Sequence, residues 1–119
     1  SDLDKMLNEI KPQGVLAFGS TIEHLEVVEA CAPKGIHVMM EKPMATTVND
    51  AEKMVALSKK YNTYVLTNFE TSWYPTTDKT FSLTRDTSFM GKIRKVVVHD
   101  GHEGPMEIGV QKKFFEWRR

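Results

Sequence analysis

The chain has 119 residues, 40% of them hydrophobic, and its 16 Lys and Arg residues balance 16 Asp and Glu residues. A formal net charge of zero gives no long-range field that attracts polyanions, so neither nucleic acid nor an anionic membrane surface is an expected partner. This size and composition allow one domain with a core, or parts of two domains.

Two further features concern the compartment. A single cysteine, Cys31, cannot form an internal disulfide and is expected to fill a small apolar space in a helix face. No apolar run approaches the roughly 20 residues that span a bilayer, and the charged segment 1–10 does not resemble a signal peptide. We therefore expect a soluble protein. Its single cysteine neither requires nor excludes an oxidising compartment, and the expected location is the cytoplasm.

The first elements alternate between helix and strand. Helical spacing of apolar residues predicts a short helix over 2–10, and the apolar run 14–19 suits a parallel strand that is buried on both faces. Thr21 is the expected N-cap of the next helix, which ends at Pro33-Lys34-Gly35 with Gly35 in the left-handed conformation. A second continuous apolar strand is predicted over 36–40.

The alternation continues once more. Thr47 to Asp50 resembles a capping box and starts a helix that ends at Tyr61-Asn62. The β-branched and aromatic run 63–69 predicts a third strand. Strands that alternate with helices across short connections indicate an α/β fold with an open parallel sheet.

The composition changes after Tyr74-Pro75. Residues 76–90 are mostly polar. The sequence of residues 92–99 predicts a strand that belongs to a different, mostly antiparallel sheet. We therefore predict two parts: the second half of a Rossmann-type doubly wound sheet over 1–75, and a linker with the beginning of a second α/β domain over 76–119.

Polar residues follow each predicted strand of the parallel sheet. Ligands bind such sheets outside the carboxyl ends of the strands, where the loops meet at one rim. Pro43 restricts the backbone of Lys42 and has no N–H to donate, so the lysine is expected to be fixed in direction. The three strand ends are Gly19-Ser20-Thr21, Glu41-Lys42-Pro43 and Asn68-Phe69-Glu70.

Two stretches carry a resemblance to a known family. Residues 14–24, GVLAFGSTIEH, and residues 35–43, GIHVMMEKP, resemble the glucose-fructose oxidoreductase, inositol dehydrogenase and MocA (Gfo/Idh/MocA) family of oxidoreductases. The Glu-Lys-Pro step after the strand is the most specific signature of that family. The resemblance covers about residues 1–75 well and the remainder more loosely. It implies an NAD(P)-binding Rossmann domain followed by an α/β substrate domain.

The resemblance also implies roles for individual residues. Lys42 would be the catalytic residue, would touch a ribose or substrate hydroxyl and would assist proton movement, while the cofactor, NAD or NADP, supplies the hydride chemistry. Trp73 and His102 would contact the sugar or polyol substrate together with Lys42. The implied cofactor-binding residues are Gly19, Ser20, Thr21, His24, Glu41, Lys42, Pro43 and Asn68.

Some family features differ or do not occur in this sequence. Gly19-Ser20-Thr21 replaces the usual Thr-Pro-Asn, and Ser72 replaces an arginine, which affects individual contacts more than the fold. No G-x-G-x-x-G motif is found, so we expect an internal piece of a longer, homo-oligomeric oxidoreductase that is inactive on its own.

Each signal has a structural alternative. Glu41-Lys42 could be a surface ion pair, although the strand-and-turn context favours function. For His24, a packing role and a cofactor contact are equally consistent with the sequence. For Trp73, packing is favoured over a substrate contact. His99, His102 and Glu103 lack further ligands at a recognised spacing, so no metal is expected. The competing function is an interaction module, in which the exposed edges of a half-sheet pair with another chain.

Overall fold

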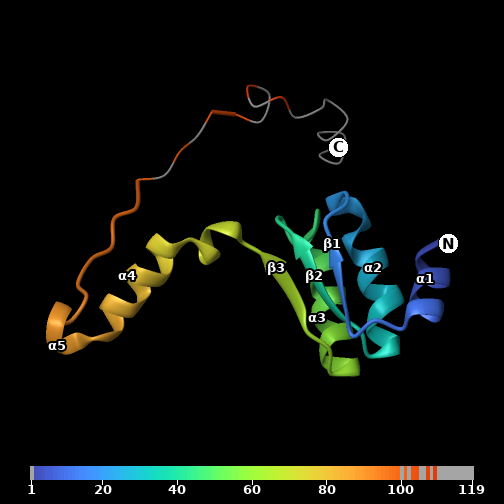
Figure 1. The fold of residues 1–119 in the computed structure, drawn as a ribbon. Coiled ribbons are helices and arrows are strands. Elements are labelled where there is room, and N and C mark those ends of the chain that lie inside the picture. Colours follow the sequence, from blue (N-terminus) through green and yellow to red (C-terminus); the bar gives the residue numbers. More distant parts are fainter. Residues whose placement is uncertain (1, 100, 102, 105–106, 108, 110–119) are drawn as a thin grey trace. The chain divides into compact units, whose positions relative to one another are not determined.

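The computed structural model describes residues 2–99, 101, 103–104, 107 and 109. These residues divide into two compact units, with the boundary between Asn68 and Phe69. Figure 1 shows the first unit as a small sheet with its helices, and the second as helices followed by an extended segment.

A three-stranded parallel sheet organises the first unit. Its strands are β1 (Gly14–Ala17), β2 (His37–Glu41) and β3 (Val65–Asn68), in the order β1-β2-β3. Val38 pairs with Val15 on one side and with Val65 on the other, which fixes the register of the whole sheet. The predicted parallel α/β arrangement is therefore confirmed. Strands β1 and β3 are shorter than the apolar runs that predicted them, and β2 is shifted by one residue from the predicted range 36–40.

Helices connect and cover the strands. They are α1 (Asp2–Ile10), α2 (His24–Cys31) and α3 (Val48–Tyr61), with short 3-10 turns η1 (Thr21–Glu23) and η2 (Ala32–Lys34) at the ends of α2. Gly35 has φ 72° and ends η2, as predicted, and Asn62 ends α3 with φ 51°. Both residue types tolerate this left-handed conformation better than most side chains do.

The start of α2 differs from the prediction. Ser20, and not Thr21, is the N-cap of η1, the 3-10 turn that leads into α2, and Thr21 is buried in the first turn of η1. The Ser20 backbone N–H donates to Glu23 Oε2 over 3.1 Å, so the glutamate returns to the helix start as in a capping box. Serine and threonine are comparable N-cap residues, so the sequence alone could not decide which of the two neighbours is the N-cap.

The start of α3 follows the prediction. Thr47 is the N-cap, and its Oγ1 accepts a hydrogen bond from the Asp50 backbone N–H over 3.1 Å. The same hydroxyl donates to Asp50 Oδ2 over 2.8 Å. Asp50 thus makes half of a capping box, since its backbone N–H donates to the threonine, while its carboxylate accepts from the threonine hydroxyl in place of the N-cap backbone N–H.

The core lies between the helices and one face of the sheet. Alternate strand residues point to opposite faces, and Val38 and Met40 of β2 are buried against the helices. Burial of Cys31 raises the pKa of its thiol, against the opposing effect of the nearby Lys34 charge. The buried apolar residues are Leu7, Ala17, Val28, Cys31, Ala32, Ile36, Val38, Met40 and Met54.

The opposite face of the sheet corrects the prediction of strands buried on both faces. Leu16, Met39 and Leu66 lie side by side in register on this face. Leu16 is 66% exposed and Leu66 is 51% exposed, so no described element of the first unit covers them. The strands are apolar on both faces, as a doubly covered sheet requires, while the described helices cover one.

The second unit begins with helices that the sequence did not predict. It contains η3 (Glu70–Trp73), α4 (Pro75–Arg85) and α5 (Thr87–Met90). Pro75 occupies the first turn of α4, where proline is well tolerated because its missing N–H is not needed. Asp86 caps α5, and its hydrogen bonds from the Ser88 side chain and from the backbone N–H groups of Ser88 and Phe89 lower its pKa.

The strand predicted over 92–99 is wrong. Segment 92–99 forms no ladder in the described structure and its side chains are exposed. β-branched side chains favour an extended backbone, but a strand also needs a partner for its N–H and C=O groups. The described residues of this unit supply no such partner.

No helix within the described ranges is both long and apolar enough to cross a bilayer.

Replacing a core methionine tests this arrangement of the core. Met40 is fully buried, so Met40→Ala should lower the free energy of unfolding by about 2–5 kcal/mol, because it removes packed atoms and leaves a cavity. Met90→Ala is the matched control, since Met90 is 53% exposed and should change this free energy by less than about 0.5 kcal/mol. Urea unfolding followed by circular dichroism measures both, and equal effects would contradict the assigned core.

Candidate functional site

The ends of β2 and β3 are joined by a side-chain hydrogen bond. Glu41 and Asn68 are paired in the parallel register, so both side chains leave the sheet at its carboxyl edge. Asn68 Nδ2 donates to Glu41 Oε1 over 2.7 Å in a partly buried position. A hydrogen bond to a charged acceptor is stronger than one between neutral groups, so this contact fixes the separation of the two strand ends.

The other carboxylate oxygen of Glu41 holds the next residue. The backbone N–H of Lys42 donates to Glu41 Oε2 over 3.3 Å. One carboxylate therefore orients both the end of β3 and the peptide that carries Lys42. The peptide bond between Lys42 and Pro43 is cis.

Lys42 presents a free cation at this edge. Its side chain is exposed, and its ammonium group forms no ion pair or hydrogen bond with any described residue. Glu41, the nearest acid in sequence, is engaged through Asn68 and through the Lys42 backbone. The surface ion pair that was the structural alternative for Glu41-Lys42 is therefore not formed.

His24 supports the loop that follows Pro43. It is 1% exposed, and its Nδ1 lies 3.1 Å from the carbonyl oxygen of Met44. A carbonyl can only accept, so Nδ1 carries the proton and donates. His24 Nε2 is also buried and has no hydrogen-bond partner among the described residues. The sequence left His24 open between packing and cofactor contact, and this geometry gives it a packing and loop-holding contact.

The end of β1 contributes mainly backbone groups, and few side chains, to this edge of the sheet. Gly19 is exposed, and a Cβ at this position would lie 3.0 Å from Glu23 Oε2. The absent side chain therefore leaves room above the first turn of η1. Ser20 is half-buried, and the buried Thr21 side chain lies within the first turn of η1.

The remaining predicted residues lie elsewhere. Trp73 belongs to the second unit, where it ends η3 and is 69% exposed. His102 lies outside the described residues. The structure thus brings Glu41, Lys42 and Asn68 together, with His24 beneath the same loop through Met44.

Sequence reasoning missed two contacts that organise this site. The Glu41–Asn68 bond depends on strand register, and the His24–Met44 bond joins residues 20 positions apart. The only signal in the sequence was the polar residue at each strand end.

Within the described ranges, no group of three or more His, Cys, Asp or Glu side chains is arranged to hold a metal ion.

Comparison with known proteins gives a family match over the first unit. Residues 1–69 match the model of the Gfo/Idh/MocA oxidoreductases, described as an oxidoreductase family with an NAD-binding Rossmann fold. The myo-inositol 2-dehydrogenase of Thermotoga maritima is 29% identical over 94 residues, which are 79% of this chain and 27% of that enzyme.

Solved structures agree with the family match. A "probable dehydrogenase" from Thermotoga maritima superposes with a TM-score of 0.70 at 27% identity, over 77% of this chain and 28% of that one. The aldose-aldose oxidoreductase of Caulobacter crescentus superposes with a TM-score of 0.61 at 29% identity, over 71% and 25%. The chain spans about a quarter of the length of each of these relatives.

A double-mutant cycle tests the bond between the strand ends. Asn68→Ala should lower the free energy of unfolding by about 1–2 kcal/mol, because the Glu41 carboxylate loses a charge-assisted hydrogen bond. In the background of Glu41→Ala the same substitution should cost much less, which gives the coupling energy of the pair. Asn49→Ala on the exposed side of α3 is the matched control. Additive effects of the substitutions at residues 41 and 68 would contradict the assigned hydrogen bond.

Proposed function

The chain belongs to the Gfo/Idh/MocA oxidoreductase family, and from this premise we propose that it is part of an NAD(P)-dependent oxidoreductase. The reaction is hydride transfer between the nicotinamide cofactor and a carbon that bears a hydroxyl group in a sugar or polyol. The related myo-inositol dehydrogenase and aldose-aldose oxidoreductase support this substrate class. The observation that carries the proposal is the unpaired Lys42 ammonium beside the Glu41–Asn68 bond at the carboxyl edge of the sheet.

The residues at this edge fit a nicotinamide cofactor. Gly19 leaves space at the end of β1, and a Cβ there would lie 3.0 Å from Glu23 Oε2, close enough that the glutamate side chain would have to shift slightly. Asn68 and Glu41 offer polar groups that suit the hydroxyl-rich ribose. Ser20 and Pro43 would complete the contact surface, while the buried Thr21 and His24 would shape the turns beneath it.

Each residue has a separate task in this proposal. The cofactor, when bound, supplies the hydride-accepting or hydride-donating carbon. Glu41 orients the Lys42 backbone through a 3.3 Å hydrogen bond, and Lys42 hydrogen-bonds a ribose or substrate hydroxyl and assists movement of its proton. Trp73 and His102 are proposed substrate contacts on the basis of the family resemblance.

The 119 residues alone are proposed to be inactive. The sequence contains no G-x-G-x-x-G turn, the element that holds the pyrophosphate in Rossmann domains. Activity is therefore expected only in the complete enzyme, which also determines the preference for NAD or NADP and is expected to be a homo-oligomer.

Lys42→Met in the complete enzyme tests the proposed function. Removing the ammonium while keeping an unbranched side chain should reduce kcat/KM for the polyol substrate by about 100-fold to 10,000-fold. Lys59→Met is the matched control, because Lys59 is an exposed lysine of α3 outside the site, and it should leave kcat/KM unchanged.

NADH and NADPH titrations, followed by nicotinamide fluorescence, should show that Lys42→Met still binds the cofactor, with affinity reduced by about tenfold or more if the ammonium group contacts the ribose. If the complete enzyme binds neither nucleotide, or if Lys42→Met and Lys59→Met behave alike, the proposal is wrong.

The uncovered face of the sheet favours a second candidate function. Leu16, Met39 and Leu66 form an exposed apolar row, and such rows commonly mark contact surfaces. As an interaction module, the chain would associate with a second copy through this face. Sedimentation should then show a concentration-dependent dimer that Leu66→Asp abolishes. A strictly monomeric chain would remove this alternative.

A further inference from the structure

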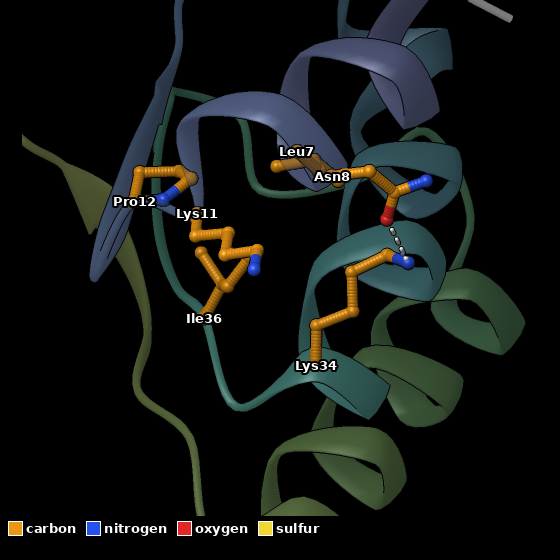
Figure 2. Close-up of a pocket in the computed structure, with 6 residues that line it drawn as sticks. All are labelled: Leu7, Asn8, Lys11, Pro12, Lys34 and Ile36. Atoms are coloured by element: carbon orange, nitrogen blue, oxygen red, sulfur yellow. Dashed lines mark hydrogen bonds between the residues drawn. The ribbon is translucent and has the colours of Figure 1, made fainter.

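A hollow lies at the amino ends of β1 and β2, at the other end of the sheet from Lys42. It encloses about 440 Å³ between the end of α1, the segment before β1 and the turn from η2 into β2. Ligand pockets in proteins typically have volumes of about 300–1,000 Å³, so a small molecule fits this space. Figure 2 shows the lining residues, Leu7, Asn8, Lys11, Pro12, Lys34 and Ile36.

The floor of this hollow is apolar. Leu7 is 1% exposed and Ile36 is 5% exposed, so both belong to the core, close the bottom of the hollow and offer a ligand little surface of their own. Pro12 adds a ring with a restricted backbone on one side. This part of the hollow suits the hydrocarbon portion of a ligand.

Two lysines make the rim strongly positive. Lys34 Nζ donates to Asn8 Oδ1 over 3.1 Å, which holds the ammonium group at the edge of the hollow without neutralising it (Figure 2). Lys11 contributes the second ammonium group. Neither lysine forms an ion pair with a described residue, and no carboxylate lines the hollow. Two uncompensated charges beside an apolar floor favour an anion.

The backbone of Lys11 belongs to the end of α1. It has φ 49°, in the left-handed region, where glycine or asparagine is the usual choice at the end of a helix. Its N–H donates to the Leu7 carbonyl over 3.1 Å, which closes α1. A left-handed residue commonly ends a helix, so this conformation sets where the Lys11 side chain starts and does not by itself indicate a ligand.

We propose that this hollow binds a small anionic ligand, a carboxylate or phosphate ester with an apolar body, between Lys11 and Lys34. The apolar body packs on Pro12 above the floor formed by Leu7 and Ile36, and the anion accepts hydrogen bonds from both ammonium groups. Because the hollow lies at the amino ends of the strands, the ligand does not compete for the edge that carries Glu41, Lys42 and Asn68. The site therefore does not depend on the function proposed above.

Phenyl phosphate, benzoate, inorganic phosphate and benzyl alcohol are suitable probes, because they separate the charge from the apolar body. Titrations of the ¹⁵N-labelled chain, followed by NMR, should show saturable shifts of the Leu7, Lys34 and Ile36 amides with phenyl phosphate or benzoate. A dissociation constant of about 1 mM is expected for ligands of this size. Inorganic phosphate and benzyl alcohol should each bind about tenfold more weakly, and the stronger of the two organic anions identifies the preferred acid.

Two variants separate binding from folding. Lys11→Gly removes the ammonium group and suits the left-handed backbone, so it should keep or slightly raise Tm while weakening binding about tenfold. Lys34→Gln should weaken binding by a similar factor, and Lys59→Gln on α3 is the matched control that should not change it.

Three outcomes would overturn the proposal. The first is an absence of saturable shifts at these amides with either organic anion. The second is equal binding by Lys59→Gln and both hollow variants. The third is a lower Tm with unchanged binding for Lys11→Gly, which would mean that Lys11 serves only the negative C-terminal end of α1.

Discussion

The hydrogen bond between Asn68 and Glu41 is the contact on which the candidate site depends. Parallel pairing places the two residues side by side, and the 2.7 Å bond then holds the ends of β2 and β3 at a fixed separation. Since the same carboxylate also accepts the Lys42 N–H, the position of the ammonium-bearing residue follows from the register of the sheet. A one-residue slip would send Glu41 to the opposite face and leave Lys42 without this support.

The core makes that register stable. Val38 and Met40 are buried on the same face of β2, and Glu41 follows on the other face, so the packing that fixes the strand also fixes the direction of the glutamate. His24 connects the core to the loop, since it is buried in α2 and donates to Met44 just beyond Pro43. Stability and the placement of Lys42 therefore share the same residues.

Much of the first unit could be predicted from the sequence because its signals are local. Helical spacing, the capping pair of Thr47 and Asp50, and the left-handed Gly35 each predict an element end from a few neighbouring residues. The side-chain bonds of the site could not be predicted, because they join residues 20 or more positions apart through a register that only packing decides. The sequence also did not reveal that the helices cover only one face of the sheet, because the exposed Leu16 and Leu66 are as apolar as the buried strand residues.

Predictions for the second unit failed where the conformational preference of individual residues was not matched by hydrogen-bonding partners for their backbone. Val96, Val97 and Val98 favour an extended backbone, but segment 92–99 finds no strand to pair with among the described residues. Helix α4 was missed because its many Thr and Ser residues have modest helix propensity, while Pro75 at its first turn was the available signal.

The most direct test of the central claim is a crystal structure of the complete enzyme with bound nicotinamide cofactor. The account predicts that Lys42 Nζ lies within about 3.2 Å of a ribose or substrate oxygen, with the Glu41–Asn68 bond intact behind it. A cofactor bound away from this edge, with the Lys42 ammonium group in bulk solvent, would contradict it.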